Sequence, residues 1–356
     1  MITTINNKHK KLNVPNLRFP EFQGEWISKT IGDIAPLQRG FDLPTGQICN
    51  GKIPVVYSNG IMNHHSSYKC VAPGVVTGRS GTIGKFTYIE DGYYWPHNTS
   101  LWVTNFYDNN PKFIYYLYQT IRIGQYSMGS GVPTLNRNNV HRHQTFIPKL
   151  EEQKKIATFL SLLDERIATQ SKIIDKLQSL IKGIGKQLFM DNQNWRTVRI
   201  GELLRIGNGK DYKHLGIGKI PVYGTGGQML LVNDYLYDGE SVCIGRKGTI
   251  DTPMFLKGKF WTVDTLFYTY DFKDVLPKFC YYLFLQINWK LYNEGTGVPS
   301  LSKSTIENIK VKIPSLEQQQ KICSVLDCYE HKTKSEEQIL ELYLSEKQYL
   351  LRQMFI

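Results

Sequence analysis

Two short glycine-rich segments carry the basic side chains that could most directly contact an anion. A glycine-rich loop can cradle a nucleotide phosphate, yet neither residues 78–84 nor residues 245–250 contain the Gly-x-x-x-x-Gly-Lys-Ser/Thr pattern of a P-loop. The pattern favours tight turns between strands instead. Their polar side chains either contact a nucleic-acid backbone or serve the fold, and the candidates are Arg79, Ser80, Arg246 and Lys247.

A second pair of segments follows a Gly-x-Gly-Val-Pro sequence in each half of the chain. Residues 134–138 and 300–304 combine amide, hydroxyl and basic groups. Such groups suit phosphate contacts, and Asn or Arg also suits bidentate contacts to bases. The alternative is a solvated loop. The candidates are Asn136, Arg137, Ser302 and Lys303.

Catalytic and metal-binding motifs are missing from the sequence. It has no Asn/Asp-Pro-Pro-Tyr/Phe methyltransferase motif and no dinucleotide fingerprint in a strand-helix-strand unit. The six cysteines form no Cys-x-x-Cys pair, and no Cys/His spacing suits zinc. The histidine pairs at 64–65 and 141–143 are interpreted as surface or base-contacting residues. We therefore predict no catalytic residue and no metal ligand.

The second half of the sequence repeats the first at an offset of 166 to 169 residues. The Gly-Arg-x-Gly-Thr-Ile segment at residue 78 returns at residue 245 with five identities in six positions. Six further blocks recur in the same order, among them Ile-Pro-Val at residues 53 and 220 and Pro-Lys-Phe at residues 111 and 277. An internal duplication explains this order, and composition alone does not.

If the folded part of each copy reads DNA, base-reading residues are expected where the two copies differ, because reading two different sequences needs different side chains. The stretch after Tyr57 differs strongly between the copies. Its candidates are Ser58, Asn59, Asn63, His64 and His65 in the first copy, and Tyr223, Thr225, Gln228 and Asn233 in the second. Drift of surface residues would produce the same divergence, so the alternative stays open.

The charge of the chain favours a polyanionic partner. Lys and Arg number 43 against 31 Asp and Glu, which gives a net charge of +12. The basic excess falls mainly in residues 1–150 and 191–316. No signal peptide or 18-residue apolar run is present, so we expect a cytoplasmic protein with reduced thiols and no membrane contact.

Local signals predict mixed α and β structure in each copy. Runs such as residues 55–57, residues 74–77 and the alternating Ile309, Val311 and Ile313 are typical of strands. Short helices are expected after Pro111 and Pro277. Pro148 and Pro314 should end the preceding strands, and Ser315 with Gln318 has the form of a capping box.

Each copy ends in a segment whose apolar residues step by four and three positions, the seam of a coiled coil. About forty residues at 1.5 Å each give a rod of about 57 Å. The second seam is weaker because polar residues interrupt it. The apolar seam residues are Ile156, Leu160, Leu163, Ile167, Ile174, Leu177, Ile181, Ile184 and Leu188 in the first segment, and Ile322, Leu326, Leu340, Leu350 and Met354 in the second.

Pairing of the two helices within the chain is the preferred arrangement, although pairing between chains remains open. An antiparallel pair would relate the two heads by a pseudo-twofold axis, the symmetry of the duplex DNA backbone. Two heads of different sequence would then read a bipartite, asymmetric site. The alternative is a coiled-coil scaffold whose basic heads bind protein or membrane.

The order of these blocks resembles the specificity subunits of type I restriction-modification enzymes. The resemblance covers nearly the whole chain. It rests on the start at residues 15–26, the twice-written Gly-Arg-x-Gly-Thr-Ile, the Pro-x-Leu-Glu-x-Gln-x-Lys-Ile segments from Pro148 and Pro314, and the ending at residues 187–189. No single block is specific, but their order and duplication are.

The resemblance implies an α+β fold in which two tandem, strand- and loop-rich target recognition domains are separated by two long helices packed as an antiparallel coiled coil. The expected domains are residues 1–150 and 191–316, and the expected helices lie in residues 151–190 and 317–356. The implied partners are double-stranded DNA, two methyltransferase subunits and restriction subunits. S-adenosylmethionine, ATP and magnesium are expected on those subunits and no cofactor on this chain. Outward residues that could meet a methyltransferase are Lys154, Arg166, Lys172 and Lys176.

Overall fold

The computed structural model describes residues 13–128, 133–190 and 194–356. The chain forms two compact units. Unit 1 comprises Met1–Gln170 with Ile339–Ile356, and unit 2 comprises Ser171–Gln338. Residues 129–132, which belong to one of the repeated sequence blocks, lie outside the described residues. Among the described helices, none is long and apolar enough to cross a membrane.

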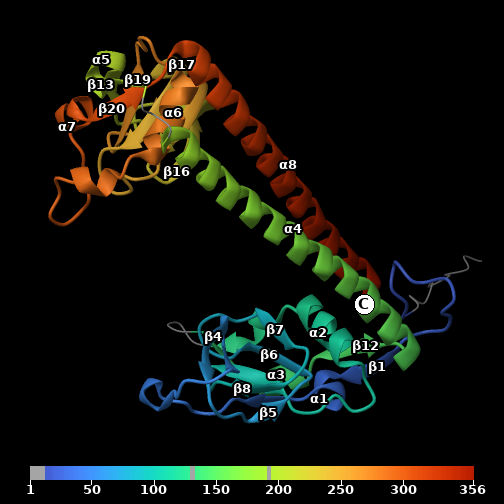
Figure 1. Ribbon diagram of the computed structural model, residues 1–356. Helices are drawn as coiled ribbons and strands as arrows, with labels where there is room; N and C mark the ends of the chain where they lie inside the picture. Colours follow the sequence, from blue (N-terminus) through green and yellow to red (C-terminus); the bar gives the residue numbers. More distant parts are fainter. Residues whose placement is uncertain (1–12, 129–132, 191–193) are drawn as a thin grey trace, which may run out of the picture. The chain divides into compact units, whose positions relative to one another are not determined.

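Unit 1 contains two four-stranded sheets, one in the order β2-β9-β6-β7 and the other in the order β4-β3-β8-β5 (Figure 1). Neighbouring strands are antiparallel except for β3 and β8, which pair parallel. The strands are β2 (Leu37–Arg39), β3 (Ile53–Tyr57), β4 (Gly60–His65), β5 (Cys70–Val71), β6 (Gly74–Gly78), β7 (Phe86–Ile89), β8 (Tyr93–Pro96) and β9 (Ser100–Val103). The strands predicted at residues 55–57 and 74–77 are therefore confirmed.

Unit 2 builds the same arrangement as one six-stranded sheet in the order β14-β19-β17-β18-β15-β16. The parallel pair is now β15 with β18, the counterpart of β3 with β8. The strands are β14 (Arg205–Asn208), β15 (Ile217–Gly224), β16 (Gly227–Val232), β17 (Tyr237–Gly245), β18 (Met254–Thr262) and β19 (Leu266–Tyr270).

The sheets differ because long strands of unit 2 replace pairs of short ones in unit 1. Strand β17 spans the counterparts of β5 and β6, and β18 spans those of β7 and β8. Pro73 lies between β5 and β6, and proline has no N–H to donate to a ladder. The matching stretch of β17 passes through Gly239, which pairs with Gly258 of β18 and so keeps the ladder continuous.

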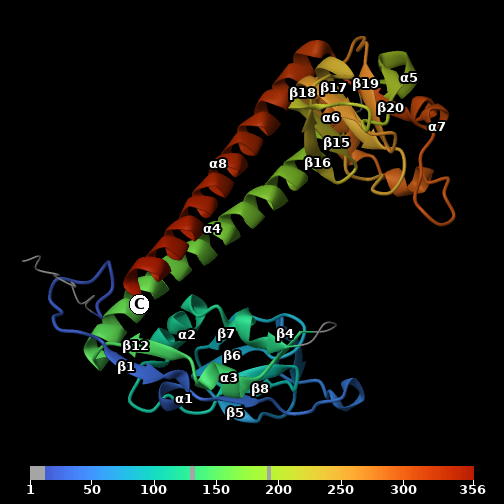
Figure 2. The same ribbon diagram turned by 180° about the vertical axis from the view of Figure 1, so that it is seen from behind.

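One short helix joins each sheet to a long helix. Helix α2 (Pro111–Thr120) and helix α6 (Pro277–Gln286) both begin at a proline, as the sequence predicts. The hydroxyl of Tyr116 on α2 donates to Asp164 at 2.7 Å, and Tyr282 on α6 donates to Asp327 at 2.7 Å. Burial raises the pKa of both tyrosines, so both hydroxyls stay protonated and act as donors. Figures 1 and 2 show α2 and α6 between the sheets and the long helices.

Small elements complete each unit, and all of those in unit 2 have counterparts in unit 1. In unit 1 they are β1 (Ile27–Thr30), α1 (Ile31–Ile34), η1 (Thr45–Gln47), η2 (Ile123–Tyr126), β10 (Ser127–Met128), β11 (Thr134–Leu135), α3 (Arg137–His141) and β12 (Gln144–Ile147). In unit 2 they are β13 (Arg196–Arg199), α5 (Ile200–Leu203), η3 (Trp289–Tyr292), α7 (Lys303–Asn308) and β20 (Lys310–Ile313). Pro148 and Pro314 directly follow β12 and β20, as predicted.

The two long helices, α4 (Leu150–Met190) and α8 (Leu316–Met354), pair antiparallel within the chain. In unit 1 the first turns of α4, with Ile156 and Leu160, share a core with the last turns of α8, with Leu350 and Met354. In unit 2 the core contains Phe189 near the end of α4 and Ile322 and Leu326 near the start of α8. The two-domain fold with long antiparallel helices is therefore confirmed.

Every residue of both seams is buried or half-buried, including the polar ones. Lys347, a polar interruption in the second seam, forms an ion pair with Asp164 of α4 at 2.7 Å. Thr333 is 7% exposed, and its hydroxyl donates to the carbonyl oxygen of Tyr329 in the preceding turn. Polar side chains therefore fit this seam because they find partners in it.

The first turn of each long helix contains a buried glutamine that the sequence analysis did not single out. Gln153 donates to the carbonyl oxygen of Pro148 and to Asn109, and it accepts from the backbone N–H of Asn110. Gln319 repeats this with Pro314, Asp274 and Leu276. The hydroxyl of Ser315 accepts from the backbone N–H of Gln318 at 3.4 Å, one half of the predicted capping box.

Candidate nucleic-acid interface

The glycine turn of unit 1 pairs with the segment that follows residue 133. The backbone N–H of Leu135 donates to the carbonyl oxygen of Arg79 at 2.7 Å, and Ser80 and Thr134 form an isolated β-bridge. The fold thus brings two separately predicted groups together, Arg79 and Ser80 with Asn136 and Arg137.

Unit 2 repeats these contacts. The backbone N–H of Leu301 donates to the carbonyl oxygen of Arg246 at 2.9 Å, and Lys247 forms a bridge with Ser300. Lys247 and the segment carrying Ser302 and Lys303 therefore lie together as well.

Backbone geometry explains the glycines of the duplicated turn. A Cβ on Gly78 would collide with the carbonyl oxygen of Thr82, and a Cβ on Gly245 would collide with that of Thr249. Gly81 and Gly248 have φ of +82° and +91°, which side chains with a Cβ rarely adopt. The glycines are therefore required by the turn itself, so contact with a ligand depends on the other side chains of the turn.

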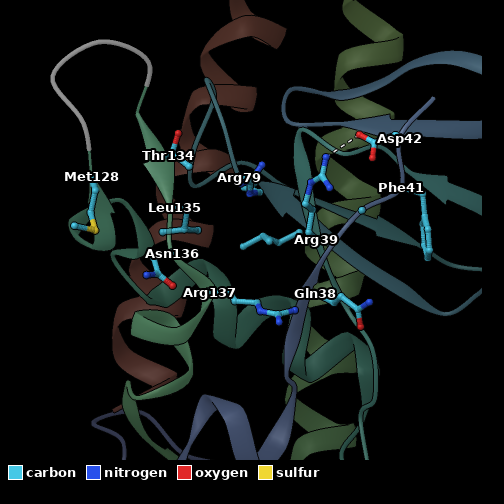
Figure 3. A pocket seen from close by; sticks show the side chains of 12 residues that line it. Gln38, Arg39, Phe41, Asp42, Arg79, Met128, Thr134, Leu135, Asn136 and Arg137 are labelled. Atoms are coloured by element: carbon cyan, nitrogen blue, oxygen red, sulfur yellow. Dashed lines mark hydrogen bonds and ion pairs between the residues drawn. The ribbon is translucent and has the colours of Figure 1, made fainter. Parts of the chain in front are cut away.

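Three arginines of unit 1 surround one hollow of about 760 Å³ beside the glycine turn. Arg79 comes from the turn, Arg137 from the start of α3, and Arg39 from the end of β2. Figure 3 shows their side chains around this hollow, with Arg39 joined to Asp42 by an ion pair of 2.7 Å. Among the described residues, Arg79 and Arg137 have no ion-pair partner.

Arg39 was missed by the sequence analysis. It lies far from Arg79 along the chain and reaches it because β2 pairs with β9, which also pairs with β6. The signal in the sequence was the difference between the copies. In the shared strand register the residue matching Arg39 is Asn208, since Gly40 and Gly209 make the same backbone contact to β9 and β19.

The same place in unit 2 has different chemistry. The guanidinium of Arg246 donates to the carbonyl oxygen of Asp264 at 3.4 Å and lies 6.0 Å from the ring of Phe267. The carboxylate of Glu294 accepts from Ser302 at 2.8 Å and also from Thr305. Hydrogen bonds from the hydroxyls of Thr305 and Ser302 lower the pKa of the Glu294 carboxyl, so it carries a negative charge at neutral pH.

The hairpin of β3 and β4 carries the residues predicted to read bases in unit 1. Ser58 lies next to the glycine turn, where a Cβ on Gly81 would be 3.9 Å from its hydroxyl. The carbonyl oxygen of Asn59 accepts from Lys85 at 2.6 Å. Asn63 is exposed and donates to the hydroxyl of Tyr57 at 3.1 Å, and His64 is exposed.

Three histidines near this surface are held by the fold. His65 is 7% exposed, accepts from the backbone N–H of Cys49 at 3.1 Å and packs edge-on against Trp95. His141 accepts from the backbone N–H of Leu37, and His143 bonds to Tyr126. Burial lowers the pKa of His141 and of His143, which keeps both rings neutral. These rings are bound by the protein, in contrast to His64.

The hairpin of β15 and β16 is the counterpart in unit 2. Thr225 lies beside the turn at Gly248, as Ser58 does at Gly81, and Gln228 is exposed. Tyr223 packs against the apolar cluster of Cys243. Asn233 accepts from the backbone N–H of Gly216 at 3.0 Å, a contact that closes the end of the hairpin.

Two exposed leucines of this hairpin were also missed. In the strand registers, Leu230 pairs with Val222 as Asn63 pairs with Val55, and Leu231 pairs with Pro221 as His64 pairs with Pro54. Leu230 and Leu231 are 36% and 44% exposed. At the positions where unit 1 presents an amide and an imidazole, unit 2 therefore presents two apolar side chains.

The outward faces of the long helices combine basic and apolar residues. Lys154, Arg166, Lys172 and Lys176 are exposed, and Lys154 forms an ion pair with Glu151. Exposed apolar residues occur at matching positions of the two copies, 166 residues apart, in the pairs Leu150 and Leu316, Phe159 and Val325, and Ile173 and Ile339.

Comparison with known proteins gives consistent matches. The family model described as type I restriction modification DNA specificity domain matches residues 23–179 and 192–342. The type I restriction enzyme MjaVIII specificity subunit of Methanocaldococcus jannaschii is 25% identical over 268 residues, which are 59% of this chain and 62% of that protein. The Escherichia coli EcoDI specificity subunit is 28% identical over 141 residues, 38% of this chain and 31% of that protein. The matches thus span less than two thirds of the length of these relatives.

Two solved structures share the fold. The crystal structure of the type I restriction-modification S subunit from M. genitalium has a TM-score of 0.66 at 18% identity and covers 96% of this chain and 99% of that chain. A chain from a study of complex assembly and conformational transition of the type I R-M system has a TM-score of 0.55 at 14% identity, covering 92% of this chain and 96% of that one.

Proposed function

This chain belongs to the family of type I restriction-modification DNA specificity domains, and we propose from this that it is a specificity subunit that binds a bipartite, asymmetric DNA site. Residues 1–150 and 191–316 act as the two target recognition domains, and residues 151–190 and 317–356 act as the helices that connect them. The chain performs no catalysis. A role on chromosomal DNA implies the cytoplasm as its compartment.

One observation carries the proposal more than any other. In both units the glycine turn meets the segment after the Gly-Val-Pro sequence through the same backbone contacts, and a hydroxyl of the hairpin, Ser58 or Thr225, lies beside the turn, while the exposed side chains differ. A repeated framework with different exposed groups is what two half-sites of different sequence require, since phosphate contacts position a protein and base contacts specify the sequence. The net charge of +12 supports a polyanionic ligand.

We propose that two methyltransferase subunits dock on the outward faces of the long helices. The exposed apolar pairs at matching positions support this, because a partner that recognises Leu150, Phe159 and Ile173 can recognise Leu316, Val325 and Ile339 in the same order. S-adenosylmethionine would be bound by these subunits. Restriction subunits with ATP and magnesium would join the same assembly.

A genome-wide methylation map tests the function directly. Cells that make this chain with its matching methyltransferase subunit are compared with cells that make the methyltransferase subunit alone. We expect a single new split motif, which names both half-sites. If the complex assembles and no new methylation appears, the DNA-reading function is wrong and a scaffold role replaces it.

The same map tests whether the helices set the distance between the half-sites. With Lys347 opposite Asp164 as the register, residues 168–174 lie opposite residues 337–343. Deleting both heptads keeps the seams in phase and shortens the pair by about 10 Å, which is up to about three base pairs. We expect a shorter gap with both half-sites unchanged. Altered half-sites would contradict a role of the helices as a spacer.

A further inference from the structure

Arg39, Arg79 and Arg137 form the arginine hollow of unit 1, and the matching positions in unit 2 are Asn208, Arg246 and Lys303. We propose that this hollow is the main phosphate anchor of the protein and that unit 2 contributes few backbone contacts. One half of the split site then supplies most of the sequence-independent affinity. The inference rests on the proposed DNA-binding function and adds a division of labour between the units.

The hollow has the chemistry of a site for phosphodiester groups. Guanidinium groups bind phosphate oxygens in a bidentate manner and carry little hydration to remove. Arg137 is exposed, Arg79 is half-exposed, and neither has an ion-pair partner among the described residues. Asp42 is the one acid among the described residues that line the hollow, and its carboxylate accepts from Arg39 and from Asn98. An excess of positive charge is left for a ligand.

The surroundings favour a nucleic-acid backbone as that ligand. The hollow adjoins the hairpin turn at Ser58, so a duplex held by its phosphates would place its base edges near Asn63 and His64. The rest of the wall combines the apolar side chains of Met128 and Leu135 with polar ones, Gln38, Thr134 and Asn136. A site for a free anion would surround it with buried donors, whereas these cations are open to solvent.

The equivalent place in unit 2 differs in three ways that oppose phosphate binding, although Lys247 takes the position of Ser80 in the turn. Asn208 replaces Arg39, Arg246 is turned toward the carbonyl oxygen of Asp264, and Glu294 occupies the position of Met128. The hydrogen bonds of Glu294 to Ser302 and Thr305 hold its carboxylate at the start of α7, where a phosphate approaching Lys303 would meet it. The negative charge of Glu294 repels the negative charge of a phosphate and so opposes its binding there.

The test uses the full chain with its methyltransferase subunit and a duplex of arbitrary sequence as the probe. Dissociation constants are measured over a series of NaCl concentrations for Arg39→Gln, Arg79→Gln and Arg137→Gln, and for the matched unit 2 variants Arg246→Gln and Lys303→Gln. Loss of one phosphate contact makes the negative slope of log K against log salt shallower by about 0.9 and lowers the affinity at 0.1 M salt by about eightfold. We expect this for each unit 1 variant and a loss of less than about twofold for each unit 2 variant.

Glu294→Gln is the complementary variant, because the amide keeps an acceptor for Ser302 and removes the charge. We expect it to raise the affinity by about twofold at low salt, the effect of one exposed charge screened by solvent. Thermal melting of every variant is compared with that of the wild type, so that a folding defect is recognised. If one single variant is unstable, the double variant of the other two arginines keeps the test open, provided that it melts like the wild type.

The outcomes separate this inference from the function on which it rests. If the wild type methylates a split motif but the unit 1 and unit 2 variants lose affinity equally, the division of labour is wrong and the function stands. If the unit 1 variants keep the wild-type slope, the hollow is not a phosphate site. If the wild type gives no methylated motif, the proposed function itself fails.

Discussion

The two units keep the same buried polar contacts and change the exposed ones. Gln153 and Gln319 make matching sets of hydrogen bonds, and Tyr116 and Tyr282 both donate to a carboxylate of a long helix. The hairpins and the walls of the hollow have diverged in charge and polarity. A buried polar group that loses its partner costs stability, whereas an exposed side chain can change freely. Divergence therefore concentrates where a ligand would bind.

The start of each long helix adds a second contrast. In unit 1, Arg18 forms a bidentate pair with Glu152 at 2.7 and 2.8 Å, and the indole of Trp26 donates to the same carboxylate. Glu152 is 3% exposed. In unit 2 the matching residue of the helix is Gln318, which is exposed. The segment before β1 is thus anchored to α4 by the Arg18–Glu152 ion pair, and the helix of unit 2 has the uncharged Gln318 at the position of Glu152.

Removing this anchor gives the largest effect that we predict. Arg18→Met leaves the carboxylate of Glu152 buried with only the indole of Trp26 as a donor, and we expect a loss of about 3 kcal/mol in the free energy of unfolding of unit 1. Chemical denaturation measures this loss if each unit gives its own unfolding transition. Lys321→Met is the control, because it breaks an exposed pair with Glu317 in unit 2 and should cost less than about 0.5 kcal/mol. Equal losses would show that Glu152 is not truly buried in the folded protein.

The buried glutamines test the shared framework. Gln153→Ala leaves the backbone N–H of Asn110 without its partner, and Gln319→Ala does the same to Leu276. We expect each substitution to cost about 2 kcal/mol in its own unit and nothing in the other. Urea denaturation of both variants compares the two costs directly. A difference above about 1 kcal/mol would mean that the two contacts are not equivalent.

Periodic and local features of the fold were predictable from the sequence. The four-three spacing from Ile156 placed every seam residue on the inner face of its helix, because burial in a long helix follows the helical period. The helices after Pro111 and Pro277 and the strand ends at Pro148 and Pro314 followed from the geometry of proline. The duplication then extended each prediction to the second copy.

Roles that depend on distant neighbours were not predictable. His65 and His64 are adjacent in sequence, yet only His65 is buried, because Trp95 and Cys49 come from other parts of unit 1. In the sequence, Gln153 cannot be told from any other polar residue in the first turn of a helix. Its role follows from its hydrogen bonds with Asn109 and Asn110, which are distant in the sequence. Arg39 joins the hollow only through a strand pairing that links β2 to β6 by way of β9.

The smallest effect concerns the hairpin positions where the units differ most. Asn63→Leu and Leu230→Asn exchange residues at one strand position, and an amide suits hydrogen bonds to adenine whereas an apolar side chain suits the thymine methyl group. We expect Asn63→Leu to alter only the half-site read by unit 1 and Leu230→Asn only the other, each by about 1 kcal/mol at one base pair. Methylation maps of the two variants show which half-site changes. Met62→Ala is the control, since both hairpins carry a methionine at this position and it should leave the motif intact. If both exchanges instead weaken methylation at all sites without altering either half-site, the hairpins hold the DNA and do not read it, and the base readers must lie elsewhere on the two units.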